Sequence, residues 1–265
     1  MPIQRFSLAA IQQIRQYIQN ALVVDAAKQA QPWVALAETD EIPEPTSIDD
    51  LSSLFAFGGR SAEEIIVPQS QAHWSLSTVN PASALLKLPG VALKSDWRLV
   101  SYLYEDSGNS AGLVVALPEP LATTAQLEKA RAASNSIKQP PQPEGALTDF
   151  MEAIEGDRST VSFLVASLLC RELREFGAKG RYQSWTHHRL VDTAPIQVNW
   201  QWQGDPPPDM TPKVKLMPDG QAVVEFFSCR IKAGVAIYRH LDHYPAVQYK
   251  LKRLDKPIAK VQSST

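Results

Sequence analysis

The chain opens with a helical pattern of apolar and polar positions. Apolar residues recur at three- and four-residue spacing, while glutamines and an arginine fall between them. The apolar positions are Phe6, Ala10, Ile14, Ile18 and Leu22. This spacing predicts a helix over residues 6–30. A second helix is predicted over residues 159–176, because Ser159 can cap its start and Gly177 can end it.

The second half of the chain alternates with the period of a β-strand. In residues 196–203, Ile, Val and two Trp alternate with polar residues, which indicates a strand with one dry and one wet face. Residues 247–251 alternate in the same way. Further strands are predicted at 182–191, 212–217, 221–231 and 234–244. Short connections favour a curved antiparallel sheet of about five or six strands, covered by the helix over 159–176.

The first half mixes both patterns. Residues 97–105 and 112–117 are β-rich and flank a turn-forming segment, which predicts a hairpin. Shorter helices are predicted at 120–137 and, beyond the prolines, at 146–155. The acidic stretch 38–50 is typical of an exposed loop or a docking site for a basic partner. Residues 51–95 give no clear pattern.

Three prolines within residues 139–145 separate segments of opposite charge. Residues 1–144 hold 10 Lys/Arg and 15 Asp/Glu, whereas residues 145–265 hold 16 and 13, for a net charge of −2 over the chain. Proline removes backbone donors and favours extended backbone, so this stretch is interpreted as a linker. We therefore expect an α+β protein of two units. They are an acidic domain over 1–138, a Pro-rich linker over 139–145, and a basic domain over 146–265 with helices followed by the antiparallel meander.

Composition places the chain among folded proteins, with 44% apolar and 20% charged residues. We expect a cytoplasmic protein, because the N-terminus lacks the apolar run of a secretory signal and no apolar stretch approaches the roughly 20 residues of a membrane span. Cys170 and Cys229 lie in apolar surroundings without a C-x-x-C pattern, so both are predicted to be buried thiols.

The strands predicted at 182–191 and 234–244 carry a set of aromatic, basic and acidic residues. These are Tyr182, Trp185, His187, His188, Arg189, Tyr238, Arg239, His240 and Asp242. Such a mixture is expected of a small-molecule site. It is equally expected of a sheet rim, where cross-strand polar pairs satisfy one another. His240 beside Asp242 would be an acid–base pair if burial tuned it.

Other chemical signals are weaker. Ser110 lies in a G-x-S-x-G sequence, but a β-rich run follows it where a hydrolase would need a helix. His187 and His188 point to opposite faces of a strand, as do positions 240 and 243, so no metal or other cofactor is expected. The basic C-terminus includes one aromatic residue, Tyr249, which makes nucleic acid an improbable partner.

No Walker A, dinucleotide-binding, zinc-protease or EF-hand motif is present. The sequence therefore predicts a non-catalytic accessory or protein-interaction protein with an unknown protein partner. Two alternatives stay open. One is a protein that binds a small molecule in an α+β pocket, and the other is a serine hydrolase that uses Ser110.

Overall fold

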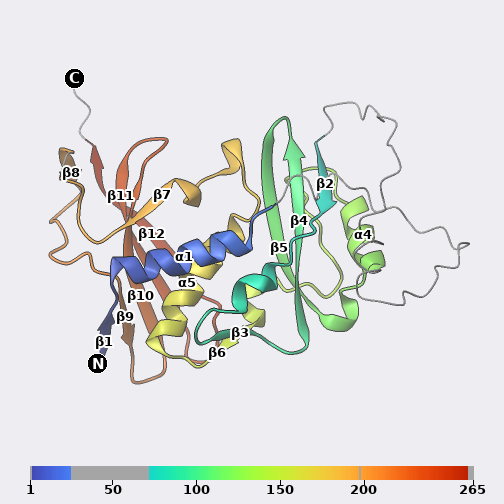
Figure 1. The fold of residues 1–265 in the computed structure, drawn as a ribbon, viewed down its shortest axis with the longest axis horizontal. Helices are drawn as coiled ribbons and strands as arrows, with labels where there is room; N and C mark the ends of the chain where they lie inside the picture. Colours follow the sequence, from blue (N-terminus) through green and yellow to red (C-terminus); the bar gives the residue numbers. More distant parts are fainter. Residues whose placement is uncertain (1, 25–71, 197, 262–265) are drawn as a thin grey trace, which may run out of the picture.

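A seven-stranded antiparallel sheet forms the larger part of the protein, which is described by a computed structural model over residues 2–24, 72–196 and 198–261 (Figure 1). The strand order is β1-β9-β10-β11-β12-β8, and β7 pairs with β10 beyond the end of β9. The strands are β1 (Ile3–Arg5), β7 (His188–Val191), β8 (Trp200–Trp202), β9 (Lys213–Leu216), β10 (Ala222–Arg230), β11 (Ala236–Tyr244) and β12 (Lys252–Val261).

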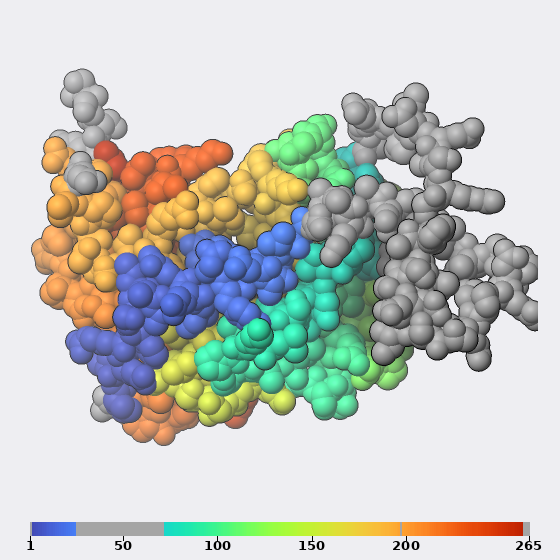
Figure 2. All heavy atoms as spheres, in the orientation of Figure 1, coloured from blue at the N-terminus to red at the C-terminus, as the bar shows by residue number. Residues whose placement is uncertain are grey.

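Helices α1 (Leu8–Ala21) and α5 (Thr160–Arg174) pack against each other beside this sheet (Figure 1). Each begins at a serine, Ser7 or Ser159, whose side chain accepts a hydrogen bond from a backbone N–H in the first turn. Helix α1 crosses the front of the molecule from the C-terminal strands to the segment after residue 72 (Figure 2). The two helices therefore connect the large sheet to the rest of the protein.

A smaller sheet lies on the other side of α5. It consists of β2 (His73–Leu76), β4 (Trp97–Asp106) and β5 (Asn109–Pro118) in the order β2-β4-β5, and α4 (Thr124–Ala132) packs on β2. Its outer strand β5 is the one nearest to α5 (Figure 1). The remaining elements are η1 (Pro81–Leu85), β3 (Val91–Leu93), η2 (Glu119–Leu121), η3 (Phe150–Ala153), β6 (Ile154–Gly156), η4 (Gly180–Tyr182) and η5 (Trp185–His187), and β3 pairs with β6.

The α+β class and the antiparallel sheet are confirmed. The sheet has more strands than expected, because the N-terminal strand β1 pairs with β9. The predicted hairpin is present as β4 and β5, and the helix over 159–176 is present as α5. Within the described residues the first helix ends at Ala21; positions 25–30, the acidic stretch 38–50 and residues 51–71 lie outside them.

Five local predictions were wrong or too long. Residues 146–155 form a short 3-10 helix and then β6, because Ile154 pairs with Leu93 across strands. Residues 247–251 form no strand, and their alternation reflects a single buried Tyr249 that stacks on Phe163. Strands begin only at positions 188 and 200 within the runs predicted over 182–191 and 196–203, and the helix predicted over 120–137 is limited to α4.

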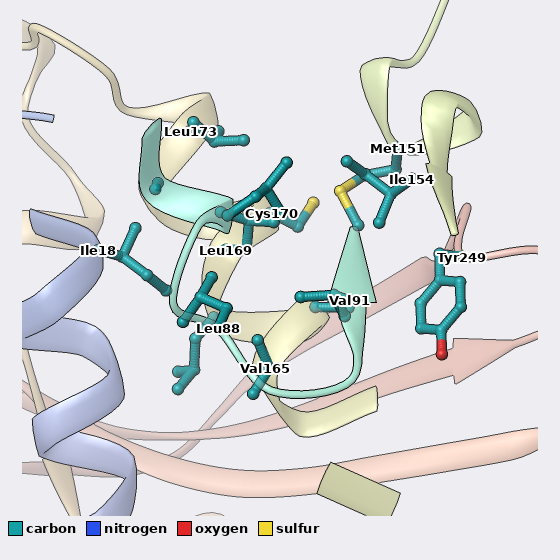
Figure 3. Close-up of a cluster of buried hydrophobic side chains, with 14 of the residues drawn as sticks. Ile18, Leu88, Val91, Met151, Ile154, Val165, Leu169, Cys170, Leu173 and Tyr249 are labelled. Carbon is teal, nitrogen blue, oxygen red and sulfur yellow. The ribbon is translucent and has the colours of Figure 1, made fainter. Parts of the chain in front are cut away.

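The largest buried cluster joins both halves of the sequence (Figure 3). Ile18 of α1 and Leu88 and Val91 lie against Val165 and Leu169 of α5 (Figure 3). The cluster thus draws side chains from both predicted domains, and the boundary at 139–145 stays a prediction. Both cysteines are buried free thiols, as predicted, and burial raises the pKa of Cys170. Among the described residues, no helix is long and apolar enough to cross a membrane.

Candidate functional site

Polar side chains from four strands meet on the face of the large sheet that α5 covers. Ser228 lies on β10, His240 on β11, Asp255 on β12 and His188 at the start of β7. In the register of the sheet, His240 is directly opposite Asp255. Directly opposed residues of antiparallel strands point to the same face, so the fold gathers side chains that are far apart in sequence.

These four side chains form one continuous chain of hydrogen bonds. Nδ1 of His188 lies 2.8 Å from Oγ of Ser228, which lies 2.7 Å from Nε2 of His240. Nδ1 of His240 in turn lies 2.7 Å from Oδ1 of Asp255. Ser228 and His240 are almost completely buried, whereas the side chain of Asp255 is 40% exposed. The chain therefore runs from a buried serine toward the protein surface.

Arg171 of α5 fixes the carboxylate end of this chain. Its guanidinium donates to both oxygens of Asp242, over 2.8 Å for the Nη2–Oδ1 pair, and to Asp255 over 2.9 Å. The Arg171 side chain is 2% exposed and that of Asp242 is fully buried. A buried charge is tolerated when it is paired and hydrogen-bonded, as here. The ion cluster thus attaches α5 to β11 and β12.

The protonation states follow from these contacts. Burial alone would raise the pKa of Asp255, but the hydrogen bond from His240 and the charge of Arg171 hold it well below its ordinary value. Burial, followed by the neighbouring His240 and Arg230, lowers the pKa of His188 to about 4, and burial also lowers that of His240. Near neutral pH the carboxylate is therefore charged and both imidazoles are neutral.

A neutral imidazole has one donor nitrogen and one acceptor nitrogen, so the charged Asp255 sets the direction of every bond. Nδ1–H of His240 donates to the carboxylate, and Nε2 of His240 accepts from the hydroxyl of Ser228. The serine oxygen then accepts from Nδ1–H of His188. Nε2 of His188 is left as an acceptor, and the one side-chain hydrogen bond of this ring to the described residues is the Nδ1 contact with Ser228.

The indole ring of Trp185 packs against the imidazole ring of His188. The two rings stack with their centroids 5.4 Å apart. The indole N–H donates to Glu172 over 2.6 Å, and Arg15 of α1 pairs with the same carboxylate over 2.7 Å. Arg15 also lies over the indole face, 4.5 Å from its centroid. Two helices therefore fix this aromatic wall.

A cavity of about 370 Å³ opens beside the polar chain. Its lining includes Tyr182, Trp185 and Tyr238 as aromatic surface, together with both imidazoles. The charged residues in the lining are Arg171, Arg174, Arg230, Arg253, Glu175 and Asp255, so cations outnumber carboxylates by four to two.

Two of the four arginines are paired with carboxylates of the described residues, and two are not. Arg171 is held by Asp242 and Asp255, and Arg174 by Asp149 over 2.8 Å. Arg230 and Arg253, in contrast, form no ion pair within the described part of the chain. Glu175 is occupied, because it accepts hydrogen bonds from the backbone of residues 184–186. The cavity is therefore positively charged, aromatic on its walls, and supplied with one neutral acceptor.

The order Ser228, His240 and Asp255 resembles the hydrogen-bond order of a serine hydrolase triad. A nucleophile, however, must reach its substrate. Ser228 has 0% exposure and does not line the cavity, and its oxygen contacts a second imidazole. The arrangement thus fits the support of two neutral histidines better than nucleophilic attack.

The structure brings together five of the nine predicted site residues in the lining of this cavity: Tyr182, Trp185, His188, Tyr238 and His240. Asp242 lies behind them, paired with Arg171. Arg239 instead pairs with Glu225 over 2.7 Å, and Arg189 lies beside α1 in a separate depression. His187 lies outside the lining.

Sequence reasoning missed Arg171, Ser228, Asp255, Arg230 and Arg253. One signal was present for Arg171, since it lies directly after Cys170 within a largely apolar helical run. Asp255 and Arg253 belong to a charged C-terminal stretch whose strand register the sequence does not give. Ser228 lies between apolar residues and a cysteine, and it becomes visible only through its neighbours.

Ser110 lies in the β4–β5 hairpin, and its hydroxyl donates to the carbonyl of Gly177 over 2.6 Å. Its use as a nucleophile stays a prediction. Within the described residues, no group of three or more His, Cys, Asp or Glu side chains could hold a metal ion. A scan against protein-family models and searches of curated proteins and of solved structures each found no match to this chain.

Proposed function

We propose that this chain is a binding protein whose cavity takes a small anionic ligand through Arg230 and Arg253. The observation that carries the proposal is that two arginines which form no ion pair with the described residues line the same cavity of about 370 Å³. Such a volume lies within the range of small-molecule sites, which combine apolar walls with few directed polar groups. Arginine is well suited to carboxylates and phosphates because its donors form a planar fork.

The neutral His188 would make the site selective among anionic ligands. Its Nε2 is an acceptor, so it favours a ligand that carries a hydroxyl or amide donor besides the anion. Trp185 and Tyr238, which contact the His188 ring, would cover a flat or apolar portion of the ligand. The proposed role is non-catalytic, in keeping with the burial of Ser228.

Calorimetric titration with benzoate, and with benzamide as its neutral counterpart, tests the proposal. We expect benzoate to bind and benzamide to bind at least tenfold more weakly. Replacement of Arg253 or Arg230 by glutamine should weaken benzoate binding by roughly 10-fold or more, since a hydrogen bond to a charged group contributes about 1.5–3 kcal/mol.

Arg189→Gln is the matched control, because Arg189 is exposed and lies outside the cavity. Its affinity for benzoate should equal that of the original chain. Equal weakening in the Arg189 and Arg253 variants would show a general effect of net charge and would refute the proposed site.

A further inference from the structure

The outer edge of β5 is only partly paired. Ser110 exchanges two backbone hydrogen bonds with Lys179, over 3.3 and 2.7 Å. Six residues further on, the carbonyl of Ala116 accepts from the N–H of Leu147 over 3.0 Å. Both contacts lie on the edge that faces away from β4, because alternate residues of a strand direct their backbone groups to the same edge.

By the same alternation, the N–H and C=O groups of Gly112 and Val114 point to this edge between the two paired ends. They have no backbone partner among the residues that the structure describes. Val114 is 6% exposed, so water reaches it poorly. A buried backbone group without a partner costs about as much free energy as a lost hydrogen bond. The open stretch therefore favours a partner.

A second cavity, of about 740 Å³, lies along this open stretch. Its lining includes Gly112 and Val114 on the β5 side and Pro140, Pro141 and Pro143 on another wall. Proline has no backbone N–H, so the Pro-rich segment is a poor partner for the unpaired carbonyls of β5. The cavity thus lies between the unpaired groups of Gly112 and Val114 and the Pro-rich segment.

The second cavity adjoins the anionic-ligand cavity. Gly112, Arg174 and Arg253 line both of them. Of the two arginines, Arg253 is the one that forms no ion pair within the described chain. Arg253, which is not ion-paired with any described residue, therefore lies with Gly112 where the two cavities meet.

We propose that this edge binds the C-terminal segment of a partner polypeptide as an added antiparallel strand, with its terminal carboxylate at Arg253. The open stretch with one residue on either side, residues 111–115, spans about 14 Å at roughly 3.4 Å per residue, which matches four or five residues. The strand runs antiparallel to β5, because the carboxylate end must lie at Gly112, near the start of β5. This inference rests on the proposed function for its carboxylate and extends it to a protein partner.

The lining also specifies the side chains of the segment. Leu113, Leu147, Phe150 and Leu173 contribute apolar surface to the second cavity. Apolar side chains of the bound segment would be covered there, while its backbone satisfies Gly112 and Val114. The partner is thus an extended chain terminus with small or medium apolar residues.

The probes are the peptide acetyl-Ala-Val-Ala-Val with a free carboxylate, its C-terminal amide, and two forms N-methylated at the second or the third residue. We expect the acid to bind at least tenfold more tightly than the amide. Only one of the two N-methylated peptides should lose affinity, by about 2- to 10-fold, since only alternate N–H groups face β5 and each net hydrogen bond contributes modestly. Hydrogen exchange at Gly112 and Val114 should slow on binding.

The protein variants are Val114→Pro, which removes one edge donor, and Val114→Ala, which keeps it. We expect the proline variant to bind the acid more weakly than the alanine variant, once both are shown to melt within a few degrees of the original chain. Equal losses from both N-methylated peptides, or no exchange protection, would overturn strand addition even while benzoate still binds. Equal affinity for acid and amide would overturn the carboxylate assignment, and an absence of benzoate binding would overturn the proposed function separately.

Discussion

Replacement of Arg171 by methionine is expected to lower the free energy of unfolding by about 3–5 kcal/mol, because it leaves a buried carboxylate without its cation. Asp242 is fully buried and receives both of its recorded side-chain hydrogen bonds from this guanidinium. The loss of the cation should cost less free energy at Asp255, because its side chain is 40% exposed and water can reach it. Urea unfolding at pH 7 measures the effect.

Arg174→Met is the matched control, because Arg174 lies three residues after Arg171 on the same helix and outside the ion cluster. Arg174 pairs with Asp149, but its side chain is 38% exposed, so its loss should cost no more than about 1 kcal/mol. The double variant Arg171→Met with Asp242→Leu should recover much of the lost stability, because no buried charge remains unpaired. Similar losses from the two single variants would show that the buried cluster does not anchor α5.

The second large effect is a loss of stability at mildly acidic pH. His188 has a pKa of about 4 in the folded protein against an ordinary value of 6.5, and the pKa of His240 is lowered as well. Between pH 6.5 and 4 the unfolded chain therefore binds more protons than the folded one, so stability falls as the pH falls. His188 alone should account for about 3 kcal/mol over this window, at roughly 1.4 kcal/mol per pH unit.

The matched variants are His188→Asn and His243→Gln. Asparagine keeps an N–H donor close to where Nδ1 of His188 meets Ser228, but it does not titrate. Its unfolding free energy should depend less steeply on pH than that of the original chain, and the exposed His243 provides the control for replacement of a histidine outside the buried chain. A slope that is identical in all three proteins would mean that folding does not lower the pKa of His188.

The elements that the sequence predicts well are those whose pattern is local. Helix α5 has its apolar stripe, its serine cap and its terminal glycine within a few residues of one another. The β4–β5 hairpin likewise follows from two β-rich runs around a turn. In each case the residues that determine the conformation are close together in sequence, so the element can be predicted without knowledge of distant contacts.

The failures share a dependence on distant contacts. The pattern predicts one strand over 182–191, yet the carboxylate of Glu175 accepts hydrogen bonds from the backbone N–H groups of residues 184–186 and turns the chain. The alternation around Tyr249 also predicts a strand, but its hydroxyl forms a hydrogen bond with Ser162 of α5 and holds a loop. Neither interaction has a local sequence signal.

The candidate site could be predicted only in part, because some of its residues lie on elements with a local pattern and others do not. His188, Tyr238 and His240 lie on elements whose strand character is readable, so their meeting could be anticipated. Arg171 comes from a helix, and Asp255 and Arg253 come from a strand whose pairing the sequence does not give. Residue composition therefore indicates a polar pocket. The sign of the charge in that pocket can be predicted only when the strand register is known.

The most direct test of the anionic-ligand site is an NMR titration of the 15N-labelled chain with benzoate at pH 7, observed at the arginine Nε–H signals. The account predicts that the signals of Arg230 and Arg253 shift together and saturate, while that of Arg189 stays in place. No shift at Arg230 and Arg253, or an equal shift at Arg189, would contradict it.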